Sequence, residues 1–201
     1  MPAELPTFYA RDRAAWRRWL ARKHERAQGV WLVRYKAKTG KPCVSYEDSV
    51  EEALCFGWID GRMQRVDDEH HVQMFTRRRP KSTWAASNKR RVAALKKAGL
   101  MMPAGLAAIE EAKRNGSWTS LDAAEALEVP ADLTAALRKK KSAAANFEAF
   151  SPSAKKAYLY WILSAKRPET RAARIADSVR YAAQNLKLDA GRDRDRSARK
   201  G

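Results

Sequence analysis

The segment VSYEDSVEEALCFGWIDGRMQRVDDEHHVQMFT, residues 44–76, decides the fold of this chain because a helix pattern passes directly into a strand pattern. Ser45 and Asp48 have the spacing of a capping box, which predicts that a helix begins there. The buried face of this helix is expected to hold Val50, Ala53, Leu54, Gly57 and Trp58. Four acidic residues are expected to face water: Glu47, Asp48, Glu51 and Glu52.

The second half of the segment predicts a β-hairpin. The tetrapeptide IDGR is expected to turn the chain at Gly61. RMQRV (residues 62–66) and HHVQMFT (residues 70–76) are typical of strands, and three acidic residues, 67–69, join them.

Toward the N-terminus, the pattern predicts another helix and another strand. Residues 13–27 have helical periodicity, with Asp12 as the N-cap and Gly29 as the stop signal. Residues 30–36, VWLVRYK, are short, β-branched and aromatic, so we expect a strand.

Toward the C-terminus, the pattern predicts only helices. A helix capped by Ser82 is expected to reach Ala98, and a second one runs from Pro103 to Gly116. Later helices are predicted to begin at Pro130, at Ser151 with Pro152, and at Pro168. The inward face of the last helix is expected to hold Ala172, Ile175, Ala176 and Val179.

These elements predict an α+β fold, in which a small antiparallel sheet with packed helices is followed by an all-helical C-terminal part. We expect an α+β domain over residues 1–118 and a helical domain over residues 119–188. Residues 189–201 have no apolar period and predict a disordered basic tail.

Composition favours anionic partners and a cytoplasmic location. The net charge is +18, and residues 61–100 carry 11 basic and 3 acidic residues. Such a balance suits nucleic acid, anionic lipid headgroups or an acidic protein, although it also serves solubility alone. The N-terminus has no pattern of a secretory signal, no stretch is long and apolar enough to span a membrane, and there are only two cysteines.

Catalytic and metal-binding signatures are absent from the sequence. The three histidines, His24, His70 and His71, form no ligand cluster with Cys43 and Cys55, so we expect neither a metal nor a cofactor. Cys55 is interpreted as a core residue, because a helix C-terminus opposes thiolate formation.

One acidic side chain remains a candidate for chemistry. Asp60 could serve as a general acid or base in a candidate pocket with Trp58. A lone Asp in a turn more often bonds to its own backbone, so a non-enzymatic protein is expected and an enzyme is the least favoured class.

Clustered basic residues are the most suggestive feature. Arginine suits bidentate contact with phosphate, so these residues form a hypothetical polyanion-binding site, with a solvated basic face as the alternative. The residues are Arg77, Arg78, Arg79, Lys81, Lys89, Arg90 and Arg91, together with Arg167, Arg171 and Arg174 on one face of the last helix.

Three segments resemble a known family. They are VSYEDSVEEALCFGWIDGRMQRVDDEHHVQMFTRRRPKSTWAASN (residues 44–88), GLMMPAGLAAIEEAKRNGSW (residues 99–118) and FEAFSPSAKKAYLYWILSAKRPETRAARI (residues 147–175). Together they resemble the bacterial YdeI/OmpD-associated family, also labelled bacteriocin-protection.

The resemblance implies an N-terminal part similar to the YjbR/CyaY-like architecture and a helical C-terminal part. It implies no catalytic residues that can be transferred. The function it suggests is that of a non-enzymatic interaction protein, linked to stress or to protection against antimicrobial peptides and bacteriocins. Sequence-nonspecific nucleic-acid binding is the alternative. The resemblance names neither the partner nor the oligomeric state.

Overall fold

The computed structural model describes residues 5–188 and confirms the α+β fold. The chain forms two compact units, which divide between Thr119 and Ser120. The assignment of residues 1–118 and 119–188 to particular domain types stays a prediction. The tail predicted at residues 189–201 lies outside the described residues.

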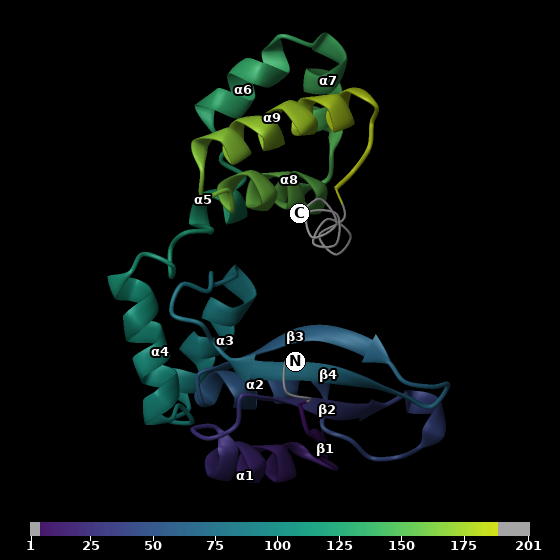
Figure 1. Cartoon of the computed structure of the whole chain (residues 1–201), viewed down its shortest axis with the longest axis vertical. Coiled ribbons are helices and arrows are strands. Elements are labelled where there is room, and N and C mark those ends of the chain that lie inside the picture. Colours follow the sequence, from purple (N-terminus) through teal and green to yellow (C-terminus); the bar gives the residue numbers. More distant parts are fainter. Residues whose placement is uncertain (1–4, 189–201) are drawn as a thin grey trace. The chain divides into compact units, whose positions relative to one another are not determined.

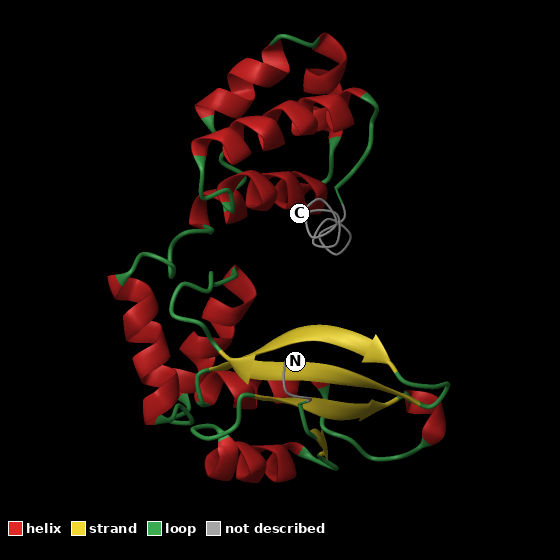
Figure 2. Ribbon diagram, in the orientation of Figure 1, coloured by secondary structure: helices red, strands yellow, loops and turns green. Residues whose placement is uncertain are grey.

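A four-stranded sheet organises unit 1, the part that ends at Thr119 (Figure 2). Its strands are β1 (Thr7–Tyr9), β2 (Gly29–Tyr35), β3 (Trp58–Arg65) and β4 (His70–Arg77), in the spatial order β1-β2-β4-β3. β2, β4 and β3 pair antiparallel, whereas β1 pairs parallel to β2. The short parallel edge strand was not predicted, because three residues show no alternating pattern.

The hairpin of β3 and β4 is confirmed, but the predicted turn at Gly61 is wrong. β3 already begins at Trp58 and continues through Gly61, with a register shift between Asp60 and Met63. The chain turns instead at Gly57, whose φ of 72° lies in the left-handed region. Glycine adopts this conformation without steric cost, so it connects the preceding helix to β3.

Four helices complete unit 1: α1 (Arg13–Lys23), α2 (Tyr46–Cys55), α3 (Ala86–Lys97) and α4 (Pro103–Arg114). The predicted caps at Asp12 and Ser45 are confirmed, since their side chains accept hydrogen bonds from Ala15 N and Asp48 N. α1 ends earlier than expected, at Lys23 instead of residue 27. Ser82 does not cap α3, because the N-cap position is Ala85.

The helices of unit 1 share one core with one face of the sheet. Trp16 of α1 packs against Phe75 of β4, with ring centroids 5.3 Å apart. Figure 1 shows α1 below the strands and α2 partly hidden behind them. α4 meets α2 closely, because a Cβ on Gly105 would lie only 2.2 Å from Cys55 O.

Unit 2 is all helical, as expected. Its helices are α5 (Asp122–Glu125), α6 (Ala131–Arg138), α7 (Lys141–Ala149), α8 (Pro152–Leu163) and α9 (Pro168–Ala183). Ser151 caps α8 by accepting from Ala154 N, and Tyr158 lies fully buried at the centre of the unit. α9 is rotated from the predicted orientation, because Ala172 and Ala176 are exposed while Ser178 is buried.

Candidate anion-binding site

Exposed cations surround the loop between β4 and α3. Arg77 is the last residue of β4, Arg79 and Lys81 lie in the loop, and Arg90 lies on α3. All four side chains are exposed, and none forms a salt bridge within residues 5–188. Their charges are therefore available to a partner.

Many other cations of the chain are already neutralised. Ion pairs with acidic side chains are formed by Arg13, Arg17, Lys41, Arg65, Lys113, Arg114, Lys155, Lys156, Arg171 and Arg180. The exposed group on the β4–α3 loop differs from these ten residues, because no intramolecular ion pair of the described residues neutralises it.

Arg78 differs from its neighbours, because it is half-buried instead of exposed. Its Cζ lies 3.7 Å from the centroid of the Trp84 ring, and its Nη2 donates to Thr83 O at 2.6 Å. Nε and Nη1 are buried without a hydrogen-bond partner among the described residues. Burial lowers the pKa of the Arg78 guanidinium to about 10, and the charge of Asp60 opposes this shift. Arg78 therefore stays protonated at neutral pH, with two unused donors.

The remaining basic residues of unit 1 have local contacts. Lys89 lies half-buried, with its Nζ 5.4 Å from the centroid of the Trp118 ring. Arg91 donates to Asn88 Oδ1 at 3.2 Å on the same helix. These two side chains extend the basic surface onto α3, but part of their hydrogen-bonding and cationic capacity is used inside the protein.

The three arginines predicted on the last helix do not act alike. Arg171 pairs with Asp132 at 2.7 Å, and Arg174 donates to Trp161 O at 2.6 Å. Only Arg167, the N-cap residue of α9, is exposed. All three lie in unit 2, so they form a candidate separate from the β4–α3 loop.

A cavity of about 270 Å³ adjoins the end of β4. Its lining includes Arg77 and Arg78, His24 and Glu25 from beyond α1, and Ala104 and Ala108 from α4. The sequence did not indicate this cavity, because its lining comes from segments that are far apart in the chain.

The predicted pair Trp58 and Asp60 lies at the start of β3, where Trp58 is the partner of Arg77 across the sheet. Trp58 is fully buried and donates from Nε1 to His24 O at 3.2 Å. Asp60 accepts from Tyr46 Oη at 3.0 Å. Burial, followed by the charge and hydrogen bond of Asp60, raises the pKa of Tyr46. A role for Trp58 and Asp60 in chemistry stays a prediction.

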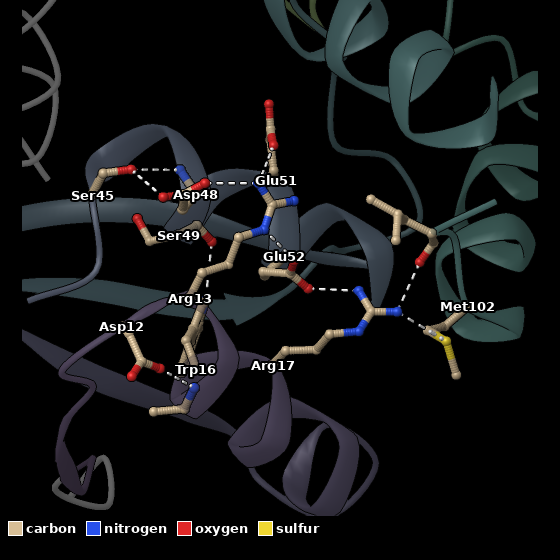
Figure 3. A network of polar contacts seen from close by, with 12 residues as sticks. Asp12, Arg13, Trp16, Arg17, Ser45, Asp48, Ser49, Glu51, Glu52 and Met102 are labelled. Atoms are coloured by element: carbon tan, nitrogen blue, oxygen red, sulfur yellow. Dashed lines mark hydrogen bonds and ion pairs between the residues drawn. The ribbon is translucent and has the colours of Figure 1, made fainter. Parts of the chain in front are cut away.

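A buried carboxylate links α1 to α2 (Figure 3). Glu52 is only 2 % exposed, which corrects the expectation that it faces water. It accepts hydrogen bonds from Arg13 Nε and Arg17 Nη1, both at 2.6 Å. Arg17 also donates to Leu100 O at 3.0 Å, so the network extends to the start of α4. Glu52, Arg13 and Arg17 all have hydrogen-bond partners, so this network stabilises the packing of α1 against α2.

Cys55 lies in the core of unit 1, as predicted. Cys55 is fully buried, and burial, together with the charge of Glu52, raises its thiol pKa. A raised pKa keeps the thiol protonated, in agreement with its interpretation as a core residue. Among residues 5–188, no group of three or more His, Cys, Asp or Glu is placed to hold a metal.

Comparison with known proteins gives two adjacent family matches. Residues 8–108 match the family described as "Domain of unknown function (DUF8412)", and residues 126–185 match the family described as "Bacteriocin-protection, YdeI or OmpD-Associated". The predicted resemblance is thus confirmed over residues 126–185, while the YjbR/CyaY-like N-terminal part is not confirmed. No curated protein and no solved structure matches the chain. Within residues 5–188, no helix has both the length and the apolar character of a membrane span.

Proposed function

Because the chain belongs to the family described as a domain of unknown function (DUF8412), a description that names no activity, we propose its function from its own residues: it is a non-enzymatic interaction protein that binds an anionic partner. The match over residues 126–185 supports a role in bacteriocin protection, and a role in stress remains a further prediction. The proposal places this partner in the cytoplasm. A YjbR/CyaY-like origin of the N-terminal part remains a further prediction.

The observation that carries the proposal is the loop between β4 and α3. Arg77, Arg79 and Lys81 are exposed without ion pairs among the described residues, and Arg78 holds two unused donors between them. Carboxylates and phosphates match the planar guanidinium group, so an anionic surface complements this loop.

The sign of the charge argues against direct capture of cationic peptides. Many membrane-active peptides are rich in Lys and Arg on their polar face. A protein of net charge +18 repels such a peptide instead of binding it. Protection would therefore act through an anionic component of the cell.

The test compares a loop variant with a variant of equal charge. In the first, Arg77, Arg79 and Lys81 are replaced by Gln; in the second, the exposed α1 residues Arg18, Arg22 and Lys23 are replaced by Gln. Tagged proteins are used to recover partners from a bacterial lysate, with and without nuclease. We expect the loop variant alone to lose a nuclease-resistant protein partner.

Two results would contradict this proposal. Equal loss of the partner in both variants would show that net charge, not the loop, is responsible. Loss of all partners after nuclease treatment of the parent protein would favour the nucleic-acid alternative. In that case binding to duplex DNA should weaken with salt, and the slope of log affinity against log salt should flatten by up to about 3 in the loop variant.

A further inference from the structure

The sheet of unit 1 has a second face that its helices do not cover. Residues that pair directly across the sheet have side chains on the same face. Val30 pairs with Phe75, and both belong to the core that the sheet shares with the helices. The alternate residues of β2 and β4 must then lie on the opposite face.

This opposite face, which we call the open face, is largely apolar and aromatic. The register places Trp31 beside Met74, Val33 beside Val72, and Tyr35 beside His70. β1 adds Tyr9, which is 41 % exposed. At its centre, Val33 and Val72 are buried, each 8 % exposed, whereas Trp31, Tyr35 and Met74 are half-buried.

Cations lie over the aromatic rings of the open face. The Cζ of Arg62 lies 5.2 Å from the Trp31 ring centroid, and the Nζ of Lys41 lies 4.7 Å from the Tyr35 ring centroid. Tyr35 also contacts Tyr9 edge-on, at 5.4 Å between centroids, and His70 at 5.6 Å. Lys41 is already paired with Glu69 at 2.7 Å, so the positive charge that remains beside these rings among the described residues is that of Arg62.

We propose that the open face binds single-stranded nucleic acid, with bases stacking near Trp31 and Tyr35 and phosphates contacting Arg62. Bases offer flat π-surfaces that are accessible only when unpaired, and single-strand binding proteins meet them with aromatic side chains along a positive groove. The Arg62 guanidinium group on this face complements the phosphates of a nucleic acid. An apolar protein segment carries no such negative charge. This inference does not depend on the β4–α3 loop.

The test measures fluorescence anisotropy with a labelled oligothymidylate of about 15 nucleotides, near the upper end of known site sizes, and with a duplex of the same length. The parent protein should bind the single strand more tightly than the duplex. Trp31→Leu should weaken single-strand binding roughly five- to 150-fold, the range for losing one stacked base. Trp31→Phe keeps a ring and should retain most of the affinity, which separates stacking from a folding defect.

Matched controls come from the same chain. Trp161→Leu removes another tryptophan that lies beneath an arginine, Arg174, but in unit 2. Arg62→Gln should weaken single-strand binding, whereas Arg18→Gln removes an exposed charge from α1 and should not. The loop variant described above should keep its preference for the single strand. A negative result for partner binding by the β4–α3 loop therefore leaves nucleic-acid binding by the open face testable.

Three outcomes would overturn the proposal. One is a folded Trp31→Leu protein that binds the single strand like the parent. Another is a parent that prefers the duplex or binds neither oligonucleotide at low salt. The third is a nuclease-resistant protein complex that Trp31→Leu disrupts in the absence of any oligonucleotide binding, which would identify the open face as a protein interface.

Discussion

Glu52 shows how one side chain can join two helices of this protein. The carboxylate is buried in α2, while the two guanidinium groups that bind it, on Arg13 and Arg17, keep about a third of their surface in water. Burial alone would lower the pKa of Arg13, but its hydrogen bonds to Glu52, Asp48 and Glu51 outweigh this effect and raise it. The pKa of Arg17 is raised as well, so both arginines remain charged at any ordinary pH.

We expect Glu52→Ala to lower the free energy of unfolding by about 1–3 kcal/mol. The loss should be smaller than the ~3–5 kcal/mol of a fully buried pair, because water can reach the released arginines. Urea unfolding followed by circular dichroism measures the change. Glu47→Ala, at an exposed site on the same helix, is the control and should change stability by less than half as much.

In contrast to Glu52, Arg78 is expected to contribute to binding and not to stability. Arg78→Met keeps an unbranched side chain against Trp84 but removes a half-buried charge with two unused donors. The free energy of unfolding should stay within about 0.5 kcal/mol of the parent or rise. Binding of the anionic partner should weaken.

The same denaturation and partner-recovery measurements test both halves of this prediction. A stability loss above about 1 kcal/mol would instead make Arg78 a structural residue that holds the loop. The loop variant leaves Arg78 unchanged, because Arg78 is half-buried whereas Arg77, Arg79 and Lys81 are exposed.

At the scale of elements, features that depend on neighbouring residues, such as helix caps, were predicted well. Features that depend on tertiary contacts were not. Asp12, Ser45 and Ser151 cap helices as expected, because a cap depends only on a side chain and the next few backbone N–H groups. Glu52 was misplaced because its burial depends on α1, which is distant in the sequence, and Arg78 because its contact with Trp84 depends on how the β4–α3 loop folds back. Likewise, the sequence pattern predicted an exposed basic loop but gave no sign of the cavity beside it.

Glycine illustrates the same difference. The sequence predicts a turn at Gly61, but Gly61 lies within β3, where a Cβ would come within 2.6 Å of Met74 Cε. Its role is to leave space for a neighbouring side chain on the open face. A turn and a close approach both favour glycine, so composition alone cannot distinguish them.

The contact between α2 and α4 allows a direct test. Gly105→Ala would place its Cβ 2.2 Å from Cys55 O, a backbone atom that cannot move away without displacing the helix. We expect a stability loss of about 1–3 kcal/mol or more, as for other overpacked sites. Gly99→Ala is the control, because its φ of 68° introduces backbone strain without any nearby atom. Thermal unfolding of both proteins should show the larger loss for Gly105→Ala.

At the scale of the whole molecule, the two units have separate cores. Trp16, Leu32 and Phe75 belong to the core of unit 1, whereas Leu133 and Tyr158 belong to that of unit 2. Stability is therefore expected to be distributed between two cooperative regions instead of one.

Tyr158→Ala should destabilise unit 2 while leaving unit 1 intact. The substitution leaves a cavity at a fully buried position and removes the hydrogen bond from Tyr158 Oη to Leu186 O, so a loss of about 3–5 kcal/mol is expected in unit 2. Hydrogen exchange measured by mass spectrometry should accelerate in α6–α9 and stay unchanged in β2 and β4. Acceleration in both regions would show that the chain unfolds as a single cooperative unit.

The parallel pairing of β1 with β2 has a consequence for how quickly the protein acquires its structure. β1 can join the sheet only after the intervening α1 has crossed over, and β2 must find β4 across α2 and β3. Consecutive helices such as those of unit 2 need only local contacts, and chains with local contacts fold faster. Refolding from denaturant should then show a fast phase sensed by Trp161 and a slower phase sensed by the six tryptophans that precede residue 119. On the ribosome, unit 1 is synthesised before unit 2, so its slower folding can begin while unit 2 is still being made.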